Sequence, residues 1–426
     1  MVKEISSPAF EAEVLHQEGA VIVDFFSTEC PPCEALFPKL EDVQARYGDA
    51  VKIVKIFRQD NKELALSLNV RSSPTLLFYR NGKEVAPKMS GAILKSQLMA
   101  QIEATYGVKP QGSAIVPRRE VVDVLIIGAG PAGLSAAIYT SRAKLKTIVI
   151  DKGTPGGQVN LTHLVANYPG TEHPINGYLL MHKMNEQAKA SGTQVIMAAE
   201  IDQLDMAKRY VVVDETLTIE YKALIIATGS KPRSLGLEGE DRLFGKGISY
   251  CATCDGAFYE GKKVLVIGGG NSAVEESLFL TKFVSELTII HQFETFQANA
   301  TAVEEASNNP KIKVLFHHEP RQFMGTDHFE ALEIEDLVTH ERKIITDADG
   351  IFVFIGYQAQ NEVVSDQLVL DQGGYIVADE DMKTSREGVF VAGDIRSKKY
   401  RQITTAVSDG TIAALSAEKF ISQKSF

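Results

Sequence analysis

Two Cys-x-x-Cys pairs are the residues of this chain with the clearest capacity for chemistry. They are Cys30-Pro31-Pro32-Cys33 and Cys251-Ala252-Thr253-Cys254. These four are the only cysteines in 426 residues, so no thiol remains for a separate structural cross-link. In a reducing compartment, pairs with this spacing are more often catalytic or metal-binding than structural. We therefore expect dithiol–disulfide chemistry at both pairs.

The first pair lies at a junction between an expected strand and an expected helix. The apolar run AVIVDFFS at residues 20–27 precedes Cys30, and apolar positions at helical spacing follow it. The start of a helix stabilises a thiolate, so Cys30 is the expected nucleophile and Cys33 the resolving thiol. Asp24 lies inside the apolar run, where burial would raise its pKa and suit it for proton transfer to Cys33. The alternative is a solvated acid on an edge strand.

The second pair is followed directly by an acid, Asp255, which could protonate a leaving thiolate. Its alternative role is that of an ordinary carboxylate at a helix end. A zinc site shared by all four cysteines is the structural alternative to two redox pairs. Because each pair has a redox-type setting and no His lies at ligand spacing, we expect no metal.

Two glycine-rich segments have the pattern of dinucleotide-binding turns. GAGPAG at residues 128–133 and GGGNSA at residues 268–273 each follow an apolar run and begin a helical segment. Glycine lets a pyrophosphate approach the backbone N–H groups and the positive end of the helix. Asp151 ends the next strand after the first segment, where a ribose hydroxyl needs an acceptor. We expect a nucleotide at each segment; the alternative is a tight turn without a ligand.

The carboxyl-terminal part adds two further cofactor candidates. Gly393 and Asp394 follow an expected strand, where a carboxylate could bind a ribityl chain. Arg401, Gln402 and Ile403 begin a helix whose positive end can stabilise a reduced, anionic flavin ring. A surface loop and an ordinary amphipathic helix are the alternative.

The chain divides into three folded parts, so we expect an α/β protein. Strand and helix patterns alternate over residues 1–106, and the stretch 107–120, which contains Pro and Gly, is expected to be a linker. The first nucleotide-binding unit is expected over residues 121–235 and 361–426. The second unit, residues 236–360, is expected to be inserted into the first.

Composition narrows the classes of partner. The chain has 44% hydrophobic residues, a net charge of −11 and a pI near 5.4, which argues against nucleic acid or an anionic membrane as a partner. No apolar stretch approaches the roughly 18 residues that span a bilayer, and residues 1–10 lack the pattern of a secretory leader. We expect a cytoplasmic location.

A series of short motifs resembles that of the low-molecular-weight thioredoxin reductases over residues 119–426. The motifs are GAGPAG, GGQ (156–158), NYPG (167–170), ATG (227–229), YCATCDG, GGGNSAVEE, and AGD followed by RQITTA. Residues 1–106 resemble thioredoxin through VDFF before the first pair, Pro38, Ser73-Pro74-Thr75 and Gly91. The resemblance implies a thioredoxin fold followed by two Rossmann-like, three-layer nucleotide-binding domains, one for FAD and one for a nicotinamide.

The resemblance also implies a role for each cysteine of the second pair. Cys254 would face the flavin, and Cys251 would attack the disulfide of thioredoxin. The family further implies a homodimer and a large rotation of the nicotinamide domain, which alternates this disulfide between flavin and partner. The implied FAD contacts are Gly128, Gly130, Pro131, Ala132, Gly133, Asp151, Gly157, Gln158, Asn167, Ala227, Thr228, Gly229, Gly393, Asp394, Arg401, Gln402 and Ile403. The implied nicotinamide contacts are Gly268, Gly270, Asn271, Ser272, Ala273 and His291.

Two departures from the family pattern bear on clients and on the electron donor. Thioredoxins typically carry Trp before the first cysteine and Gly-Pro between the pair, whereas this chain has Glu29 and Pro31-Pro32. This difference favours a narrower set of client proteins. NADPH-dependent reductases carry a His-Arg-Arg motif where residues 291–297 here read HQFETFQ. A 2′-phosphate needs cationic partners, so NADH is expected to be a better donor than NADPH.

The expected function is that of a self-contained FAD-dependent disulfide reductase. Electrons would pass from the nicotinamide through FAD and the second cysteine pair to the first pair, in its own or a neighbouring protomer, and then to oxidised proteins. Three alternatives remain. The chain could serve one peroxiredoxin, as alkyl hydroperoxide reductase flavoproteins do. It could use a donor such as a ferredoxin or a deazaflavin, or it could be a redox-gated binding protein without turnover.

Overall fold

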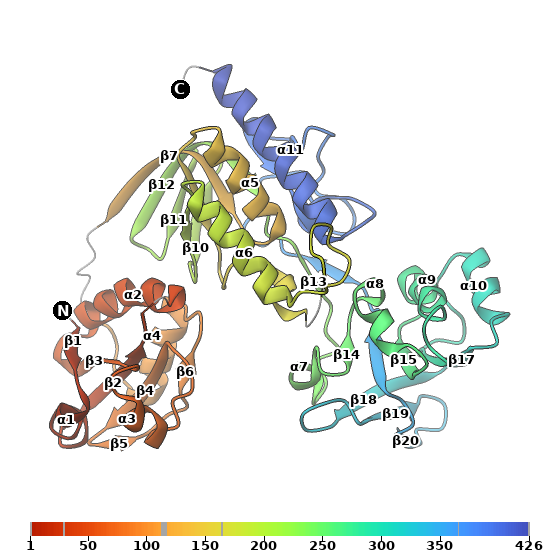
Figure 1. Ribbon diagram of the computed structural model, residues 1–426, viewed down its shortest axis with the longest axis horizontal. Coiled ribbons are helices and arrows are strands. Elements are labelled where there is room, and N and C mark those ends of the chain that lie inside the picture. Colours follow the sequence, from red (N-terminus) through yellow and green to blue (C-terminus); the bar gives the residue numbers. More distant parts are fainter. Residues whose placement is uncertain (1, 29, 112–116, 163–164, 365, 425–426) are drawn as a thin grey trace.

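The structure is a computed structural model that describes residues 2–28, 30–111, 117–162, 165–364 and 366–424. Figure 1 shows three bodies of mixed helix and strand. We call them the amino-terminal domain, the first nucleotide domain, which contains both β7 and the carboxyl-terminal helix α11, and the inserted domain between β13 and β22. The amino-terminal and inserted domains lie on opposite sides of the view. No helix among the described residues is long and apolar enough to cross a membrane.

The amino-terminal domain is a mixed sheet covered on both faces. Its strand order is β1-β3-β2-β4-β5, with β6 paired to β4. The central strands are almost continuously apolar because both faces are buried; Phe78 packs into one core and Leu77 into the other. The elements are β1 Lys3–Ile5, α1 Ser7–Phe10, β2 Ala20–Phe26, α2 Pro31–Tyr47, β3 Val51–Phe57, α3 Lys62–Ser67, β4 Thr75–Arg80, β5 Lys83–Glu84, β6 Met89–Ser90 and α4 Lys95–Tyr106.

The first nucleotide domain has the strand order β10-β11-β12-β7-β8-β9, with β23 paired to β12. Its helices α5, α6 and α11 lie side by side in Figure 1 and share one core. Because β23 comes after the inserted domain, the chain leaves this sheet and later returns to it. The elements are β7 Arg118–Ile127, α5 Pro131–Arg142, β8 Thr147–Ile150, α6 Gly177–Ala190, β9 Gln194–Ile196, β10 Ile201–Asp205, β11 Tyr210–Val213, β12 Leu217–Ile226, β23 Val389–Val391 and α11 Ile403–Ser422.

The end of the expected linker is part of a strand instead. Residues 118–120 begin β7, and Arg118 N donates to Thr216 O at 2.8 Å. The start of β7 pairs in parallel with the start of β12. The local sequence does not reveal this partner strand, so the expected linker is too long by these three residues. Residues 112–116 of the expected linker lie outside the described part of the chain.

The inserted domain contains a parallel sheet of order β14-β21-β15-β16-β17 and a separate three-stranded sheet, β18-β19-β20. The antiparallel pair β13–β22 carries the chain out of the first nucleotide domain and back. The elements are β13 Ser230–Pro232, α7 Glu240–Leu243, β14 Ile248–Ser249, α8 Ala252–Asp255, β15 Lys263–Ile267, α9 Asn271–Leu280, β16 Glu286–Ile290, α10 Ala300–Ser307, β17 Ile312–Leu315, β18 His318–Met324, β19 Ala331–Asp336, β20 Arg342–Ile345, β21 Gly350–Val353 and β22 Tyr357–Ala359.

Candidate functional site

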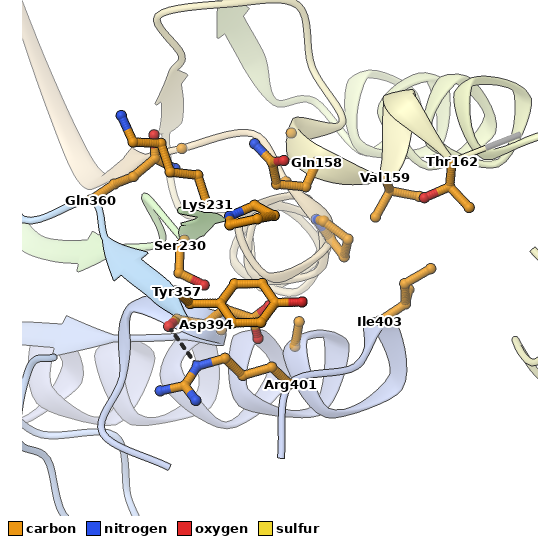
Figure 2. A pocket seen from close by; sticks show the side chains of 18 of the residues that line it. Gln158, Val159, Thr162, Ser230, Lys231, Tyr357, Gln360, Asp394, Arg401 and Ile403 are labelled. Atoms are coloured by element: carbon orange, nitrogen blue, oxygen red, sulfur yellow. Dashed lines mark hydrogen bonds between the residues drawn. The ribbon is translucent and has the colours of Figure 1, made fainter. Parts of the chain in front are cut away.

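A cavity of about 840 Å³ lies between the first nucleotide domain and the inserted domain (Figure 2). Its walls come from the glycine turn after β7, the end of β8, the start of α11 and the disulfide helix α8. This volume is within the range of small-molecule and cofactor pockets. The cavity therefore joins a nucleotide-binding turn to a cysteine pair.

The glycine turn leaves room for a ligand at the start of α5. Gly128 has φ +104°, and a Cβ atom there would lie 2.3 Å from Ala227 O, so the turn requires glycine. Gly130 lines the cavity, and a Cβ atom at Gly130 would meet no atom of the chain within 4 Å. The open space at Gly130 lies against the first N–H groups of a helix, which is where a pyrophosphate of FAD fits.

Asp151 lies at the end of β8 and is held in place by the turn. Its two carboxylate oxygens accept hydrogen bonds from Ala129 N at 2.6 Å and from Gly153 N at 2.7 Å. Burial raises the pKa of Asp151, while these two bonds act in the opposite direction. The carboxylate lines the cavity beside the glycine turn. This geometry fits an acceptor for a ribose hydroxyl.

A second carboxylate, that of Asp394, also lines the cavity (Figure 2). Burial raises its pKa, and Lys398 Nζ lies 3.3 Å from its Oδ1. Lys398 also contacts the buried Asp409 at 2.9 Å. Arg401 Nε donates to Asp394 O at 3.4 Å, and the guanidinium lies 4.0 Å from the ring centroid of Tyr375. Lys398 and Arg401 therefore hold Asp394, which could bind the hydroxyl groups of a ribityl chain.

The Cys251–Cys254 disulfide lines the same cavity. Cys251 caps α8, and its Sγ accepts a hydrogen bond from Cys254 N at 3.2 Å. Gln402, at the start of α11, donates from its side-chain amide to Thr253 Oγ1 at 3.1 Å. The disulfide helix is thus hydrogen-bonded to the first nucleotide domain at the edge of the cavity.

Asp255 also lines the cavity, next to the disulfide. Its Oδ2 accepts a hydrogen bond from Ser249 Oγ at 2.6 Å, and the same hydroxyl accepts one from Cys251 N at 3.2 Å. The hydroxyl of Ser249 therefore links the carboxylate to the backbone of the first cysteine. A role for Asp255 in protonating a leaving thiolate stays a prediction.

The amino-terminal pair forms a second disulfide, Cys30–Cys33, at the start of α2. Cys30 is 8% exposed, and its Sγ lies 3.5 Å from Ser73 O, next to the cis peptide bond before Pro74. Asp24 lies in the middle of β2 and is only 3% exposed. Burial raises the pKa of Asp24 to about 7. The alternative of a solvated edge-strand acid is wrong because β2 lies between β3 and β4.

The second glycine turn lies outside the cavity. It connects β15 to α9, and the loop after β16 folds back on it, with Gln297 N donating to Gly269 O at 2.8 Å. His291 lies against Gly269: a Cβ atom at Gly269 would lie 2.3 Å from the imidazole ring of His291. Its Nε2 lies 3.1 Å from Thr295 O, and burial lowers the pKa of His291. The loop therefore borders the turn without adding a positive charge at neutral pH.

The cavity brings together nearly all the residues expected to contact FAD. Those in its walls are Gly128, Gly130, Pro131, Ala132, Asp151, Gly157, Gln158, Asn167, Ala227, Thr228, Gly229, Gly393, Asp394, Arg401, Gln402 and Ile403, together with Cys251, Cys254 and Asp255. Gly133 is not in the wall but beneath the turn, where a Cβ atom would lie 1.8 Å from Gly128 O. The expected residues that lie apart from it are Gly268, Gly270, Asn271, Ser272, Ala273, His291, Cys30, Cys33 and Asp24. Glu29 lies outside the described residues.

Sequence reasoning missed several side chains of the cavity wall, including Tyr357, Lys231 and Gln360 (Figure 2). Tyr357 OH donates to Tyr250 O at 2.9 Å, and burial raises the pKa of Tyr357 to about 12. Gln360 donates from its side chain to Thr228 O at 2.7 Å. All three belong to or flank the β13–β22 pair. No local motif marks this pair, since it forms only where the inserted domain begins and ends.

Comparisons with known proteins agree with this geometry. A family model described as "Pyridine nucleotide-disulphide oxidoreductase" matches residues 122–410, and one described as "Thioredoxin" matches residues 1–104. The thioredoxin reductase of Peptoclostridium acidaminophilum is 44% identical over 306 residues, which cover 71% of this chain and 97% of that protein. The "34.2 kDa protein in rubredoxin operon" of Clostridium pasteurianum is 45% identical over 304 residues, covering 71% and 98%.

A solved structure gives the same result for the reductase part. The thioredoxin reductase of Streptococcus pyogenes has a TM-score of 0.67 at 36% identity and covers 71% of this chain and 99% of its own. The matches and the shared cavity show that this chain belongs to the pyridine nucleotide-disulphide oxidoreductases of the thioredoxin reductase type, with a thioredoxin domain in front of the reductase.

Proposed function

We propose that this chain passes electrons from NADH through FAD to Cys251–Cys254, then to Cys30–Cys33, and finally to disulfides of client proteins. The observation that carries the proposal is the single cavity in which the first glycine turn, Asp394 and the Cys251–Cys254 disulfide meet. FAD bound there would supply two-electron transfer between a nicotinamide and this disulfide.

The transfer between the two cysteine pairs is a dithiol–disulfide exchange. The thiolate of reduced Cys251 attacks Cys30 Sγ, the Cys30–Cys33 bond breaks, and Cys33 leaves as a thiolate that takes a proton from Asp24. Cys254 then attacks Cys251 Sγ, which re-forms the Cys251–Cys254 disulfide and releases Cys30 as a thiolate. The amino-terminal pair gains two electrons and the second pair loses two, so the exchange is balanced.

A rotation of the inserted domain is part of the proposal. The second glycine turn lies outside the cavity while the disulfide lines it, so a nicotinamide and the disulfide would use the flavin in different arrangements. A thioredoxin reductase of Lactococcus lactis, described as being in the FR conformation, has a TM-score of only 0.51 despite 38% identity and 71% coverage of this chain. The proposal attributes this low score to a second arrangement of the two domains.

NADH is proposed as the donor because residues 291–297 contain no Arg or Lys. The hydrogen bond from Gln297 to Gly269 holds this loop at the turn, where a 2′-phosphate would require a cation. The remaining proposals follow the family resemblance. They are a homodimer, and clients that are oxidised proteins, including a peroxiredoxin.

The test is anaerobic reduction of the flavin, with NADH and NADPH compared as rate over concentration in the full chain. Faster reduction by NADH supports the proposal, and faster reduction by NADPH contradicts the donor assignment. If neither nucleotide reduces the flavin, a donor of another class is needed. Reduction of the flavin without subsequent reduction of Cys30–Cys33 would contradict the proposed relay.

A further inference from the structure

Three cationic side chains of the amino-terminal domain are buried although they are charged. Lys39 and Arg46 lie on α2, Lys95 begins α4, and they are 6%, 8% and 5% exposed. Lysine and arginine are rarely this buried unless they are paired. All three lie where the amino-terminal domain meets the β10–β11–β12 end of the first nucleotide domain (Figure 1).

The pairing partners are at the tip of the β11–β12 hairpin. Arg46 Nη2 contacts Glu215 Oε2 at 2.6 Å, and Lys95 Nζ contacts the same oxygen at 3.1 Å. Lys95 also donates to Asp214 O at 2.6 Å, and Lys39 Nζ lies 3.9 Å from Asp214 Oδ2. Two acids of one domain therefore face three cations of another.

Both sides of this contact are held in shape by their own domains. In the amino-terminal domain, Asp42 Oδ2 accepts from Arg46 Nε at 3.0 Å and from Lys95 Nζ at 3.1 Å. In the hairpin, Asp214 and Glu215 have φ of +49° and +59°, a conformation that residues other than glycine seldom adopt. Glu215 N donates to Asp202 Oδ2 at 2.5 Å, which fixes the tip. Acids occupy a turn where Asn-Gly or Asp-Gly is preferred.

The described ends of the linker flank the same contact. Gln111 N donates to Arg46 O at 2.9 Å, and Arg118 N donates to Thr216 O at 2.8 Å. One end of the linker thus contacts the backbone of Arg46, and the other end lies beside Glu215. The amino-terminal domain is therefore tethered directly next to the hairpin of its own chain.

We propose that the hairpin tip Asp214–Glu215, together with Glu200, is a docking site for the cationic face of the chain's own amino-terminal domain, formed by Lys39, Arg46 and Lys95. Glu200 completes the site because its Oε2 accepts a hydrogen bond from Ser96 N at 3.2 Å, at the start of α4. Glu200 also lines the FAD cavity, so the docked domain borders the cofactor site.

The docked position is a resting position. The amino-terminal domain and the disulfide helix α8 lie apart in Figure 1. Within one chain, Cys30 reaches Cys251 only after the domain leaves the hairpin, a consequence that rests on the proposed function. The Glu215 side chain is 50% exposed, so salt screens its pairs with Arg46 and Lys95, and release is expected to increase with ionic strength.

The test uses two charge reversals from opposite sides of the contact, Glu215→Lys and Lys95→Glu, each in the full FAD-loaded chain. Lys83→Glu, an exposed site on β5, is the matched control with the same charge change as Lys95→Glu. Small-angle scattering measures the size of the particle, and hydrogen exchange measures protection of the segment that contains Ser96. Both reversals, but not the control, should enlarge the particle and speed exchange by roughly tenfold at low salt.

Unchanged scattering and exchange in both reversals would overturn the docking site. Protection that disappears on dilution would overturn the assignment to the same chain, because a partner's domain would then be the occupant. The rate of Cys30–Cys33 reduction tests the resting role. In both charge-reversal variants, this rate should equal or exceed the rate in the unchanged chain. Slower reduction would make the docked position productive and overturn that role. If Cys30–Cys33 is reduced neither in the variants nor in the unchanged chain, the proposed function is wrong. The scattering result still tests the docking site in that case.

Discussion

The side-chain amide of Gln402 donates to Thr253 Oγ1 at 3.1 Å and so joins the first nucleotide domain to the disulfide helix α8, between Cys251 and Cys254. Asn167 Nδ2 in turn lies 3.4 Å from Gln402 Oε1. The Gln402 amide therefore accepts a hydrogen bond from Asn167 through its oxygen and donates one to Thr253 through its nitrogen. This hydrogen bond joins the two domains while the disulfide lines the cavity.

Thr253→Val should weaken the arrangement in which the disulfide faces the flavin. A hydrogen bond of this kind contributes about 0.5–1.5 kcal/mol, which corresponds to a shift of roughly two- to tenfold. We expect electron transfer from reduced FAD to the disulfide to slow by this factor, as measured by rapid-mixing absorbance. Thr253→Ser keeps the hydroxyl and is the control. Equal slowing in both variants would contradict the role of the hydrogen bond, because Thr253→Ser keeps the hydroxyl.

Gly130→Val should abolish FAD binding without unfolding the chain. Gly130 has an ordinary φ of −73°, and its Cβ position is empty, so valine meets no protein atom at Cβ but fills the place of the pyrophosphate. The matched control is Gly270→Val in the second turn, where φ is −85° and the nearest atom to a Cβ is 4.0 Å away.

The two glycine variants should differ in visible flavin absorbance per protomer. The unchanged chain should be yellow with one FAD, Gly130→Val should retain less than roughly a tenth of it, and Gly270→Val should keep FAD but lose reduction by NADH. Circular dichroism checks that both remain folded. A folded Gly130→Val protein with full FAD would contradict the assignment of the cavity.

The double variant Cys33→Ser with Cys254→Ser has one thiol left in each pair, so, treated with a two-electron thiol oxidant such as an aromatic disulfide, it should form a trapped disulfide between Cys30 and Cys251. Both resolving thiols are absent in this protein, so the mixed disulfide cannot be released. Peptide mapping without reduction should identify the linked pair. Cys30→Ser with Cys254→Ser is the control and should give no such adduct. Finding Cys254 joined to Cys30 in a Cys33→Ser single variant would reverse the roles assigned to Cys251 and Cys254.

Asp24→Asn should stabilise the amino-terminal domain in a pH-dependent way. Burial raises the pKa of Asp24 in the folded chain from its usual 3.8 to about 7. The folded state therefore holds this proton more tightly than the unfolded state, and ionised Asp24 costs stability increasingly from pH about 4 to 7 and fully above that. The variant should gain a few kcal/mol at pH 8 and almost nothing at pH 4.

The measurement for Asp24→Asn is urea unfolding of the full chain, with proteolysis of the amino-terminal domain as the signal. Asp60→Asn, at an exposed position, is the control and should be neutral at both pH values. An equal gain at pH 4 and pH 8 would mean that the effect does not come from ionisation. The same variant should also slow reduction of Cys30–Cys33, because Cys33 loses its proton donor.

Local pattern was enough to predict the elements that carry the chemistry. The buried strand before Cys30, the glycine turns at 128–133 and 268–273, and Asp151 at a strand end are all signalled within short windows. Each depends on backbone conformation or apolar periodicity, which neighbouring residues determine. For the same reason the burial of Asp24 within VIVDFF could be predicted from the sequence.

What the sequence by itself determined was therefore the fold class, the two cysteine pairs and most of the residues that line the cavity at the first glycine turn. Tertiary structure alone decided which distant segments meet: Gln402 with Thr253, and Arg46 with Glu215. These pairs are separated by 149 and 169 residues, and neither forms part of a local repeat or motif. The extension of β7 to Arg118 likewise depends on a strand a hundred residues away. Such contacts depend on how the domains pack, and local periodicity carries no information about packing.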